Sequence, residues 1–386
     1  MRIAAVSPNL PSPAMPLRGV RHDEQLRGFA AAGHQVRGIV PLPWSIRSGF
    51  GGIRVPTVER DTHFAVTHPR YARLPVVWRG GPIERSLFVR AATAGLDAWA
   101  GSAPIDVVLL HSALLPGGLV GRRRGTRYVV SLYDHEIYDL APASIRSRQM
   151  IAETLSTADC AVYLSQALRR EGIALAGPHR SLVIPLGIEA ADGLVAEWPD
   201  QFTICSVARL IPRKRIDRLI KAFARLTAEH PRARLVIVGD GPERGRLERL
   251  VAALGVKPKV EFTGALDART TRERMARASV MALPSVRESL GAVYLEAMSL
   301  GVPSLGTRGE GIEEHITHGK NGILVPPDDD DALLIELRAL AGDSGYARRL
   351  GEAGKRYFAS GPFSWQANVD SFLDLFRELA DESKQP

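Results

Sequence analysis

Residues 284–311 decide the fold, and they read Pro-Ser-Val-Arg-Glu-Ser-Leu-Gly-Ala-Val-Tyr-Leu-Glu-Ala-Met-Ser-Leu-Gly-Val-Pro-Ser-Leu-Gly-Thr-Arg-Gly-Glu-Gly. The pattern predicts a strand end, a turn, a helix and the start of a second strand. Glu288 and Glu296 are eight positions apart, which would place them on nearly the same helix face. Ser289–Gly291 lie where that helix should begin, and its free N–H groups favour an anion such as a diphosphate. A surface glutamate and an ordinary helix cap would give the same spacing.

A second strand, turn and helix are predicted over residues 206–223, Ser-Val-Ala-Arg-Leu-Ile-Pro-Arg-Lys-Arg-Ile-Asp-Arg-Leu-Ile-Lys-Ala-Phe. The guanidinium of Arg209 could grip phosphate as a fork, and the ammonium of Lys214 could act as a point charge. Cations held beside a leaving diphosphate stabilise the transition state more than the ground state. Only seven of the fifty basic residues are lysines, so a lysine in this turn is informative. The alternative interpretation is that Arg209 and Lys214 are two solvent-exposed charges on a turn without a role in binding.

A third segment, residues 235–242, reads Leu-Val-Ile-Val-Gly-Asp-Gly-Pro. The next glycine is Gly245, one position too late for the Gly-x-Gly-x-x-Gly fingerprint of dinucleotide-binding folds. We therefore expect a tight strand-to-helix turn here rather than a dinucleotide site.

The order of these segments, with Val-Glu-Phe-Thr-Gly at 260–264 between them, resembles the donor lobe of retaining family-4 glycosyltransferases of GT-B fold. In that family an Arg-Leu-x-x-x-Lys turn precedes a Val-Gly-Asp-Gly-Pro strand end and a Glu-x7-Glu helix. The resemblance is close over about residues 200–365 and looser over 1–190. It implies an α/β fold of two Rossmann-like, doubly wound domains facing an interdomain cleft, with a C-terminal helix that crosses back to the first domain.

Composition agrees with a two-domain globular protein of 386 residues, 45% of them hydrophobic. Cys160 and Cys205 are the only cysteines and lie in separate apolar segments, which excludes a disulfide framework. The apolar run at the start of the sequence is too short for a signal-peptide core, and no run has the length of a membrane span. We expect a cytoplasmic protein, with peripheral contact at the inner membrane face left open.

Strands alternate with helices along the chain, which predicts parallel sheets. We expect an acceptor-binding domain over 1–187, joined by a crossing helix at 365–386, and a nucleotide-sugar donor domain over 188–364. Residues 41–90, rich in Pro, Gly and Arg, are expected to be excursions without regular structure. Four aspartates, 328–331, are expected to cap the next helix rather than to bind metal.

The resemblance implies roles for particular residues. Arg209 and Lys214 would neutralise the diphosphate, Glu296 would bind the ribose and Glu288 the hexose. Backbone groups near 264–266 would read the base. The implied donor-binding set is Gly19, Arg209, Lys214, Gly264, Ala265, Leu266, Glu288, Ser289, Leu290, Gly291, Ala292 and Glu296. For Gly19 a simple turn before the first helix is an equal alternative.

The chain departs from the family where a His-Gly pair usually follows a strand of the first domain. Tyr133 stands in the histidine position, His135 comes two residues later, and His111 follows another strand. We take His135 and His111 as catalytic candidates beside Arg209, Lys214 and Glu288, although loop histidines are more often structural. Elsewhere Arg215 replaces a usual glycine and Leu186 a usual asparagine.

The resulting prediction is a retaining hexosyltransferase that uses a nucleoside-diphosphate sugar and requires neither a metal nor a cofactor. Two alternatives stay open. A nucleotide-sugar epimerase of the same fold would act on the donor without an acceptor, and a non-catalytic subunit would bind the donor without turnover.

The charge is unevenly distributed between the two halves. Through Gly187 there are 22 basic and 13 acidic residues, giving +9, against 28 and 29 in the remainder, giving −1. This favours an anionic or lipid-linked acceptor, with a natural-product aglycone as the neutral alternative, and no nucleic-acid motif is present. Basic residues interleaved with apolar ones, which could contact an anionic membrane, are Arg70, Arg73, Arg79, Arg85 and Arg90.

Overall fold

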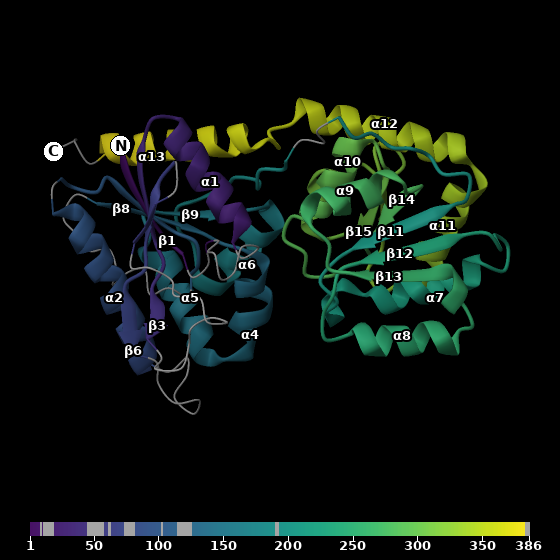
Figure 1. Cartoon of the computed structure of the whole chain (residues 1–386), viewed down its shortest axis with the longest axis horizontal. Helices are drawn as coiled ribbons and strands as arrows, with labels where there is room; N and C mark the ends of the chain where they lie inside the picture. The colour runs from purple at the N-terminus through teal and green to yellow at the C-terminus, as the bar shows by residue number, and fades with distance from the viewer. Residues whose placement is uncertain are drawn as a thin grey trace. The chain divides into compact units, whose positions relative to one another are not determined.

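The computed structural model describes residues 1–7, 10, 19–44, 58–60, 63–72, 82–101, 103–113, 126–189 and 193–382. The chain divides into two compact units, Met1–Gly187 with Trp365–Pro386, and Ile188–Ser364 (Figure 1).

The first unit is built on an eight-stranded sheet of order β10-β9-β8-β7-β1-β2-β5-β4, in which only the β4–β5 pair is antiparallel. Its strands are β1 (Arg2–Val6), β2 (Gln35–Ile39), β4 (Val58–Arg60), β5 (Ala65–Thr67), β7 (Val107–Leu110), β8 (Arg127–Ser131), β9 (Cys160–Tyr163) and β10 (Ser181–Val183). The helices are α1 (Val20–Ala31), α2 (Pro82–Ala100), η2 (Glu136–Leu140), α4 (Ala141–Ala143), α5 (Ile145–Thr157), α6 (Gln166–Ala176) and α13 (Trp365–Glu382).

The expectation of no regular structure over residues 41–90 is wrong. Strands β4 and β5 extend the sheet, β3 (Leu42–Trp44) pairs with β6 (Arg70–Ala72), and α2 begins at Pro82. Phe64 and Val66 are 6% and 7% exposed, so burial of these two side chains anchors the sheet edge. Such short strands leave little periodicity in the sequence.

The second unit holds a parallel sheet of order β13-β12-β11-β14-β15-β16. Its strands are β11 (Thr203–Val207), β12 (Arg234–Val238), β13 (Val260–Gly264), β14 (Val280–Ala282), β15 (Ser304–Thr307) and β16 (Ile323–Val325). Its helices are η3 (Pro212–Lys214), α7 (Ile216–Leu226), α8 (Arg244–Ala253), η4 (Lys257–Lys259), α9 (Ala268–Ala276), α10 (Ala292–Leu300), η5 (Gly311–Glu314), α11 (Asp330–Gly342) and α12 (Ser344–Ser360).

Strand order reverses between β11 and β14 in the second sheet, and between β1 and β7 in the first. In open parallel sheets, ligands bind beyond the carboxyl ends of the strands at such switch points. Each unit therefore presents one preferred place for a ligand.

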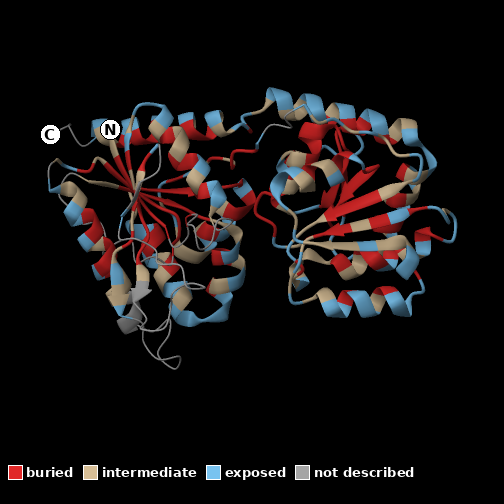
Figure 2. Ribbon diagram, viewed as in Figure 1, coloured by how far each residue is buried: buried red, intermediate tan, exposed pale blue. Residues whose placement is uncertain are grey.

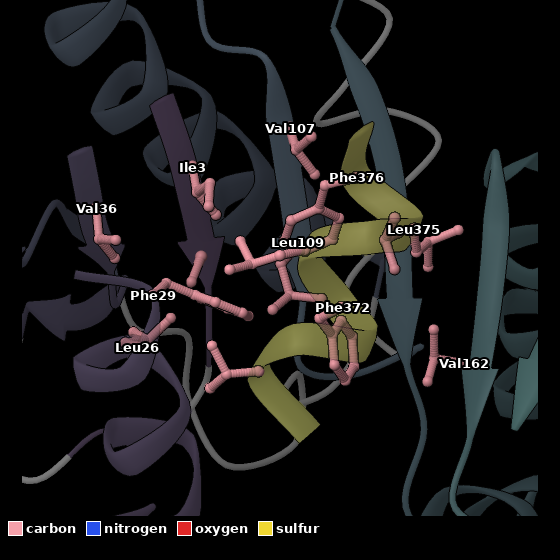
Figure 3. Close-up of a cluster of buried hydrophobic side chains, with 14 of the residues drawn as sticks. Ile3, Leu26, Phe29, Val36, Val107, Leu109, Val162, Phe372, Leu375 and Phe376 are labelled. Atoms are coloured by element: carbon pink, nitrogen blue, oxygen red, sulfur yellow. The ribbon is translucent and has the colours of Figure 1, made fainter. Parts of the chain in front are cut away.

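Helix α13, at the end of the chain, packs on the first unit and completes its core. Phe372 and Phe376 lie among side chains of β1, β7 and α1 (Figure 3), and the Phe376 ring centroid is 5.6 Å from that of Phe29. Figure 2 shows most strands of the two sheets as largely buried, whereas β13 at the edge of the second sheet is mainly half-buried. The first core therefore depends on residues distant in sequence.

The aspartate run begins α11, as predicted. The side chain of Asp329 accepts a hydrogen bond from the amide of Ala332 at 2.8 Å. Arg218 of α7 donates to Asp328 and Asp330 at 2.5 and 2.6 Å. The run therefore caps one helix and ties it to another.

Candidate active site

A buried ion pair lies at the switch point of the second sheet. Lys214 ends η3 after β11, Glu288 follows β14, and the Lys214 ammonium donates to the Glu288 carboxylate. The two side chains are 13% and 8% exposed. Removing two charges from water is costly, so loss of either partner would leave an uncompensated buried charge and destabilise the protein. The fold thus brings together two candidate residues 74 positions apart.

Backbone bonds hold the two loops in place around this pair. The amide of Val286 donates to the carbonyl of Arg213, and the Arg213 guanidinium donates to the carbonyl of Arg287, both at 2.9 Å. The two loops are therefore a single connected support for Lys214 and Glu288.

Glu310 is a site residue that the sequence argument missed. Its Oε2 accepts from the amide of Glu288 at 2.7 Å, and the amide of Gly311 donates to the Glu288 carbonyl at 3.0 Å. Burial raises the pKa of Glu310. Its only sequence signal was its place at the end of Thr-Arg-Gly-Glu-Gly, where nothing distinguished it from a surface residue.

Helix α10 begins at Ala292, so the prediction that Glu288 and Glu296 share a helix face is wrong. Gly291 is the N-cap in the left-handed region, with φ of 68°. A Cβ at Gly291 would lie 2.4 Å from the ring of Tyr294, so this position requires glycine. Glu296 is half-buried on α10, whereas Glu288 lies in the preceding loop with buried Ser289 and Leu290.

Arg209 has an exposed side chain for which the structure, within its described residues, gives no hydrogen bond or ion pair. Its neighbours are fixed by the Gly-Asp-Gly turn: the amide of Leu210 donates to the Asp240 carbonyl at 2.9 Å. At Gly239, with φ of 128°, a Cβ would be 1.9 Å from the Ala208 carbonyl oxygen. The expected tight turn is confirmed, and its glycine permits this close approach.

The loop at 264–266 lies against the same turn. The amide of Gly239 donates to the carbonyl of Gly264 at 2.8 Å. Ala265 is exposed and Leu266 half-buried, so this segment offers backbone groups to a ligand at the edge where Arg209 lies.

The first switch point holds a buried cluster of aromatic and polar side chains. Ser7 follows β1 and lies with Oγ 3.1 Å from Nδ1 of His22, a histidine of α1 that the sequence argument missed. The His22 ring stacks on His111 at 4.2 Å and lies 5.1 Å from Tyr133. The only feature of the sequence that could have indicated His22 was its place three residues after Gly19.

His111 is positioned inside this cluster rather than exposed at its surface. It is 2% exposed. Burial is the larger cause, and the nearby His22 the smaller one, that together lower the pKa of His111 well below its usual value. Its Nε2 donates to Gln25 Oε1 at 2.9 Å, and Gln25 Nε2 in turn donates to Asn368 of α13 at 2.9 Å. The lowered pKa favours the neutral imidazole of His111, and Gln25 connects this side chain to the C-terminal helix.

His135 is exposed immediately before η2, and the adjacent Glu136 is fully buried. Glu136 accepts from Ser112 Oγ at 2.5 Å and from the amides of Ala113 and Tyr133 at 2.6 and 3.2 Å. Burial raises the pKa of its carboxyl group. Glu136, which the sequence argument also missed, joins the ends of β7 and β8.

Gly19 has φ of 70° and is the N-cap of α1, which agrees with the turn alternative and leaves its amide at the helix start.

Of the basic residues that could contact a membrane, Arg70 and Arg90 are exposed. Arg73 and Arg79 lie outside the described residues, and the side chain of Arg85 is not described. Within the described part of the chain, no group of three His, Cys, Asp or Glu residues could hold a metal. None of its helices is long and apolar enough to cross a membrane.

Two family models together match most of the chain. "Glycosyl transferases group 1" matches residues 195–357, and "Glycosyl transferase 4-like domain" matches 19–187. A GDP-mannose-dependent alpha-(1-6)-phosphatidylinositol monomannoside mannosyltransferase of Mycolicibacterium smegmatis is 31% identical over 67% of this chain and 72% of its own length. An exopolysaccharide phosphotransferase of Streptomyces coelicolor is 33% identical over 79% of this chain, which spans only 30% of that protein.

Among solved structures, Anabaena HepE in complex with UDP and glucose superposes with a TM-score of 0.74 at 17% identity, covering 98% of this chain and 99% of that one. This likeness establishes the two-domain GT-B fold. The two family matches and the mannosyltransferase alignment lead to one conclusion: the chain belongs to the family-4, group 1 glycosyltransferases.

Proposed function

We propose that this protein is a retaining glycosyltransferase that moves a hexosyl unit from a nucleoside-diphosphate sugar to an acceptor hydroxyl without a metal. The observation that carries the proposal is the Lys214–Glu288 pair at the switch point of the second sheet. A cation held at this point suits a diphosphate, and a carboxylate beside it suits sugar hydroxyls.

In the proposed reaction, the acceptor oxygen bonds to the anomeric carbon on the face from which the diphosphate leaves. The bond from that carbon to the phosphate oxygen breaks, and the acceptor proton passes to the leaving phosphate. Lys214 and the exposed Arg209 would stabilise the charge that develops on the diphosphate. The amides after Glu288 would hold a phosphate at the start of α10.

Glu288 would contact the hexose and Glu296 the ribose. Glu310 supports this arrangement because its carboxylate accepts a hydrogen bond from the backbone amide of Glu288. Gly264, Ala265 and Leu266 would read the base through backbone groups. The HepE complexes with UDP and glucose and with UDP-glucose make UDP and UDP-glucose the first nucleotides to test.

The first unit would bind the acceptor at its own switch point, beside His22 and Tyr133. We assign His111 there as a positioning residue, because it is buried and bonded to Gln25. His135 is the exposed candidate for contact with the transferred sugar.

Titration calorimetry with two variants tests the proposed donor site. Glu296→Ala should weaken binding of the nucleoside diphosphate and of its sugar conjugate alike, because a charge-assisted bond to a ribose is worth about 1.5–3 kcal/mol. Glu288→Gln should leave nucleoside diphosphate binding intact and weaken only the sugar conjugate. The reverse pattern would exchange the two roles, and no effect in either variant would reject the site.

Two other activities are distinguished by the products. Rapid conversion of the donor to an epimer without acceptor would indicate an epimerase, and donor binding without turnover over a broad acceptor panel would indicate a binding subunit. We favour transfer because the mannosyltransferase relative aligns over 72% of its length.

For the acceptor we propose an anionic or lipid-linked molecule, because the +9 charge lies in the first half of the chain. Flotation with vesicles containing anionic lipid, at low and at high salt, tests peripheral membrane binding. Absence of binding at low salt would favour a small soluble acceptor such as an aglycone.

A further inference from the structure

A cationic cavity lies at the edge of the second sheet opposite the candidate donor site. It has a volume of about 420 Å³, and its lining includes Thr203, Arg234 and Val260, the first residues of β11, β12 and β13. Because these strands are parallel, their amino ends share one edge, while Arg209 and Gly264 lie at the other. The cavity is therefore separate from the proposed donor site.

The cavity lining is strongly basic. Four cationic side chains border it, and Glu261 is the only acid among the lining residues that the structure describes. The cationic residues are Arg234, Lys259, Arg274 and Arg277. Four positive charges against Glu261 and the adjacent Glu197 leave an excess of two, although the second half of the chain as a whole carries −1. The local potential thus favours an anion.

Two of these cations have acidic partners that an anion could displace. Arg274 lies 3.4 Å from Glu261, with side chains 44% and 50% exposed. Arg277 lies 3.2 Å from Glu197, with side chains 62% and 54% exposed. Ion pairs this exposed contribute about 0–1 kcal/mol, so exchange of the carboxylate for a ligand costs little.

The other two cations are uncompensated. The Arg234 guanidinium donates to the carbonyl of Pro258 at 2.5 Å, a neutral partner that fixes its position. The Lys259 side chain, on the 3-10 turn before β13, has no hydrogen bond or ion pair within the described part of the chain. A fixed guanidinium and an unpaired ammonium on one cavity wall form a phosphate-binding arrangement.

We propose that this cavity binds the phosphate groups of an anionic ligand, independently of the sugar donor. Its volume is within the range of about 300–1,000 Å³ that is typical of small-molecule sites. The apolar side chains of Val236 and Pro258 also line it and would contact the organic part of the ligand. The phosphate could belong to a soluble polyphosphate or phosphate ester, or to a lipid headgroup.

Hydrogen exchange with inorganic tripolyphosphate as the probe locates binding along the chain. We expect protection of residues 257–261 and 272–278 in the full-length protein, distinct from any protection at 209–214 and 286–292. The variant Arg234→Gln/Lys259→Gln should weaken the first effect at least about tenfold, a loss of about 1.4 kcal/mol. The matched control Lys221→Gln/Lys320→Gln removes two exposed lysines elsewhere in the same unit and should retain it.

Vesicles with and without a phosphoinositide distinguish the two sources of phosphate. Protection of 257–261 by vesicles alone would assign a headgroup, and protection by tripolyphosphate a soluble ligand. No protection with either probe, or equal protection in Arg234→Gln/Lys259→Gln, would overturn the proposal. If the double variant fails to fold, Lys259→Gln alone serves, because its side chain has no described partner to lose.

Discussion

At the residue scale, substitution of Lys214 should affect the rate of the chemical step and the affinity for the donor to different extents. Lys214→Ala should lower the rate of the chemical step by about two orders of magnitude, the effect of losing one preorganised charge stabiliser. Donor affinity should fall less, because part of the interaction forms only in the transition state. Single-turnover kinetics measure the rate and calorimetry the affinity.

A second substitution controls for the charge that Lys214→Ala leaves unpaired. Lys214→Ala/Glu288→Gln removes the uncompensated buried carboxylate and should recover stability but not rate. Near-normal turnover in either variant would contradict the assignment of Lys214.

Arg215 occupies a conformation that suits glycine. It is the residue between η3 and α7, with φ of 53° and ψ of 33°. Left-handed backbone costs a non-glycine residue about 1–2 kcal/mol, whereas its ion pair with Asp328, at 3.4 Å and exposed, contributes less. Arg215→Gly should therefore raise the free energy of unfolding by about 1 kcal/mol, measured by urea denaturation. Arg215→Val should lower it, and stabilisation by valine would contradict the backbone argument.

His111 should make stability depend on pH. Its folded pKa is well below the ordinary 6.5, so the unfolded state binds the proton first. Its contribution is complete above about pH 6.5 and is lost as the pH falls toward the folded value, by up to about 1.4 kcal/mol per pH unit. Urea denaturation at pH 7.5 and 5.5 should show a smaller pH effect in His111→Gln than in the wild type. The half-exposed His230 gives a control, His230→Gln, which should keep the wild-type slope.

At the scale of elements, α13 is part of the first core although it ends the chain. Phe376 is fully buried, with ring centroids 5.6 Å from Phe29 and 5.9 Å from Phe372. Phe376→Ala should destabilise the first unit by about 3–5 kcal/mol, the usual cost of a large cavity. Arg377→Ala, at the next, exposed position of the same helix, should cost less than about 1 kcal/mol. Equal effects of the two changes would mean that α13 does not contribute to the core in solution.

The loops after β11, β14 and β15 are elements of the proposed donor site. Each follows a different strand, and they are linked by bonds such as Arg213 to Arg287 and Glu288 to Glu310. A ligand at the start of α10 would therefore contact loops that are already connected, which reduces the entropy lost on binding.

At the scale of the whole molecule, ligand binding should distinguish the two units. All the donor candidates except Gly19 lie within Ile188–Ser364. A nucleoside diphosphate at about 100 times its Kd should stabilise that unit by about 2.7 kcal/mol through mass action. Hydrogen exchange should show the protection mainly in the second unit, and scanning calorimetry should show its transition shifted upward. Protection confined to Met1–Gly187 would reject the assignment of the donor to the second unit.

The sequence alone was sufficient for the family and the fold class. Apolar strands, the amphipathic pattern of α7 and the Gly-Asp-Gly turn depend on near neighbours in the chain, and local periodicity records them. Reliance on near neighbours in the sequence also explains why the predicted helical position of Glu288 was wrong. Its spacing from Glu296 suggested a shared helix face, but Gly291 begins the helix after Glu288.

Only the tertiary structure decided which distant residues meet. Lys214 pairs with Glu288 because β11 and β14 are neighbours at a strand reversal, a relation that leaves no periodic trace. The sequence analysis did not single out Glu310, Glu136 and His22 for the same reason, since each contacts a residue that is distant in the sequence and follows another strand of the same sheet. Strand order thus determines which side chains come together, while the local sequence determines which strands and turns exist.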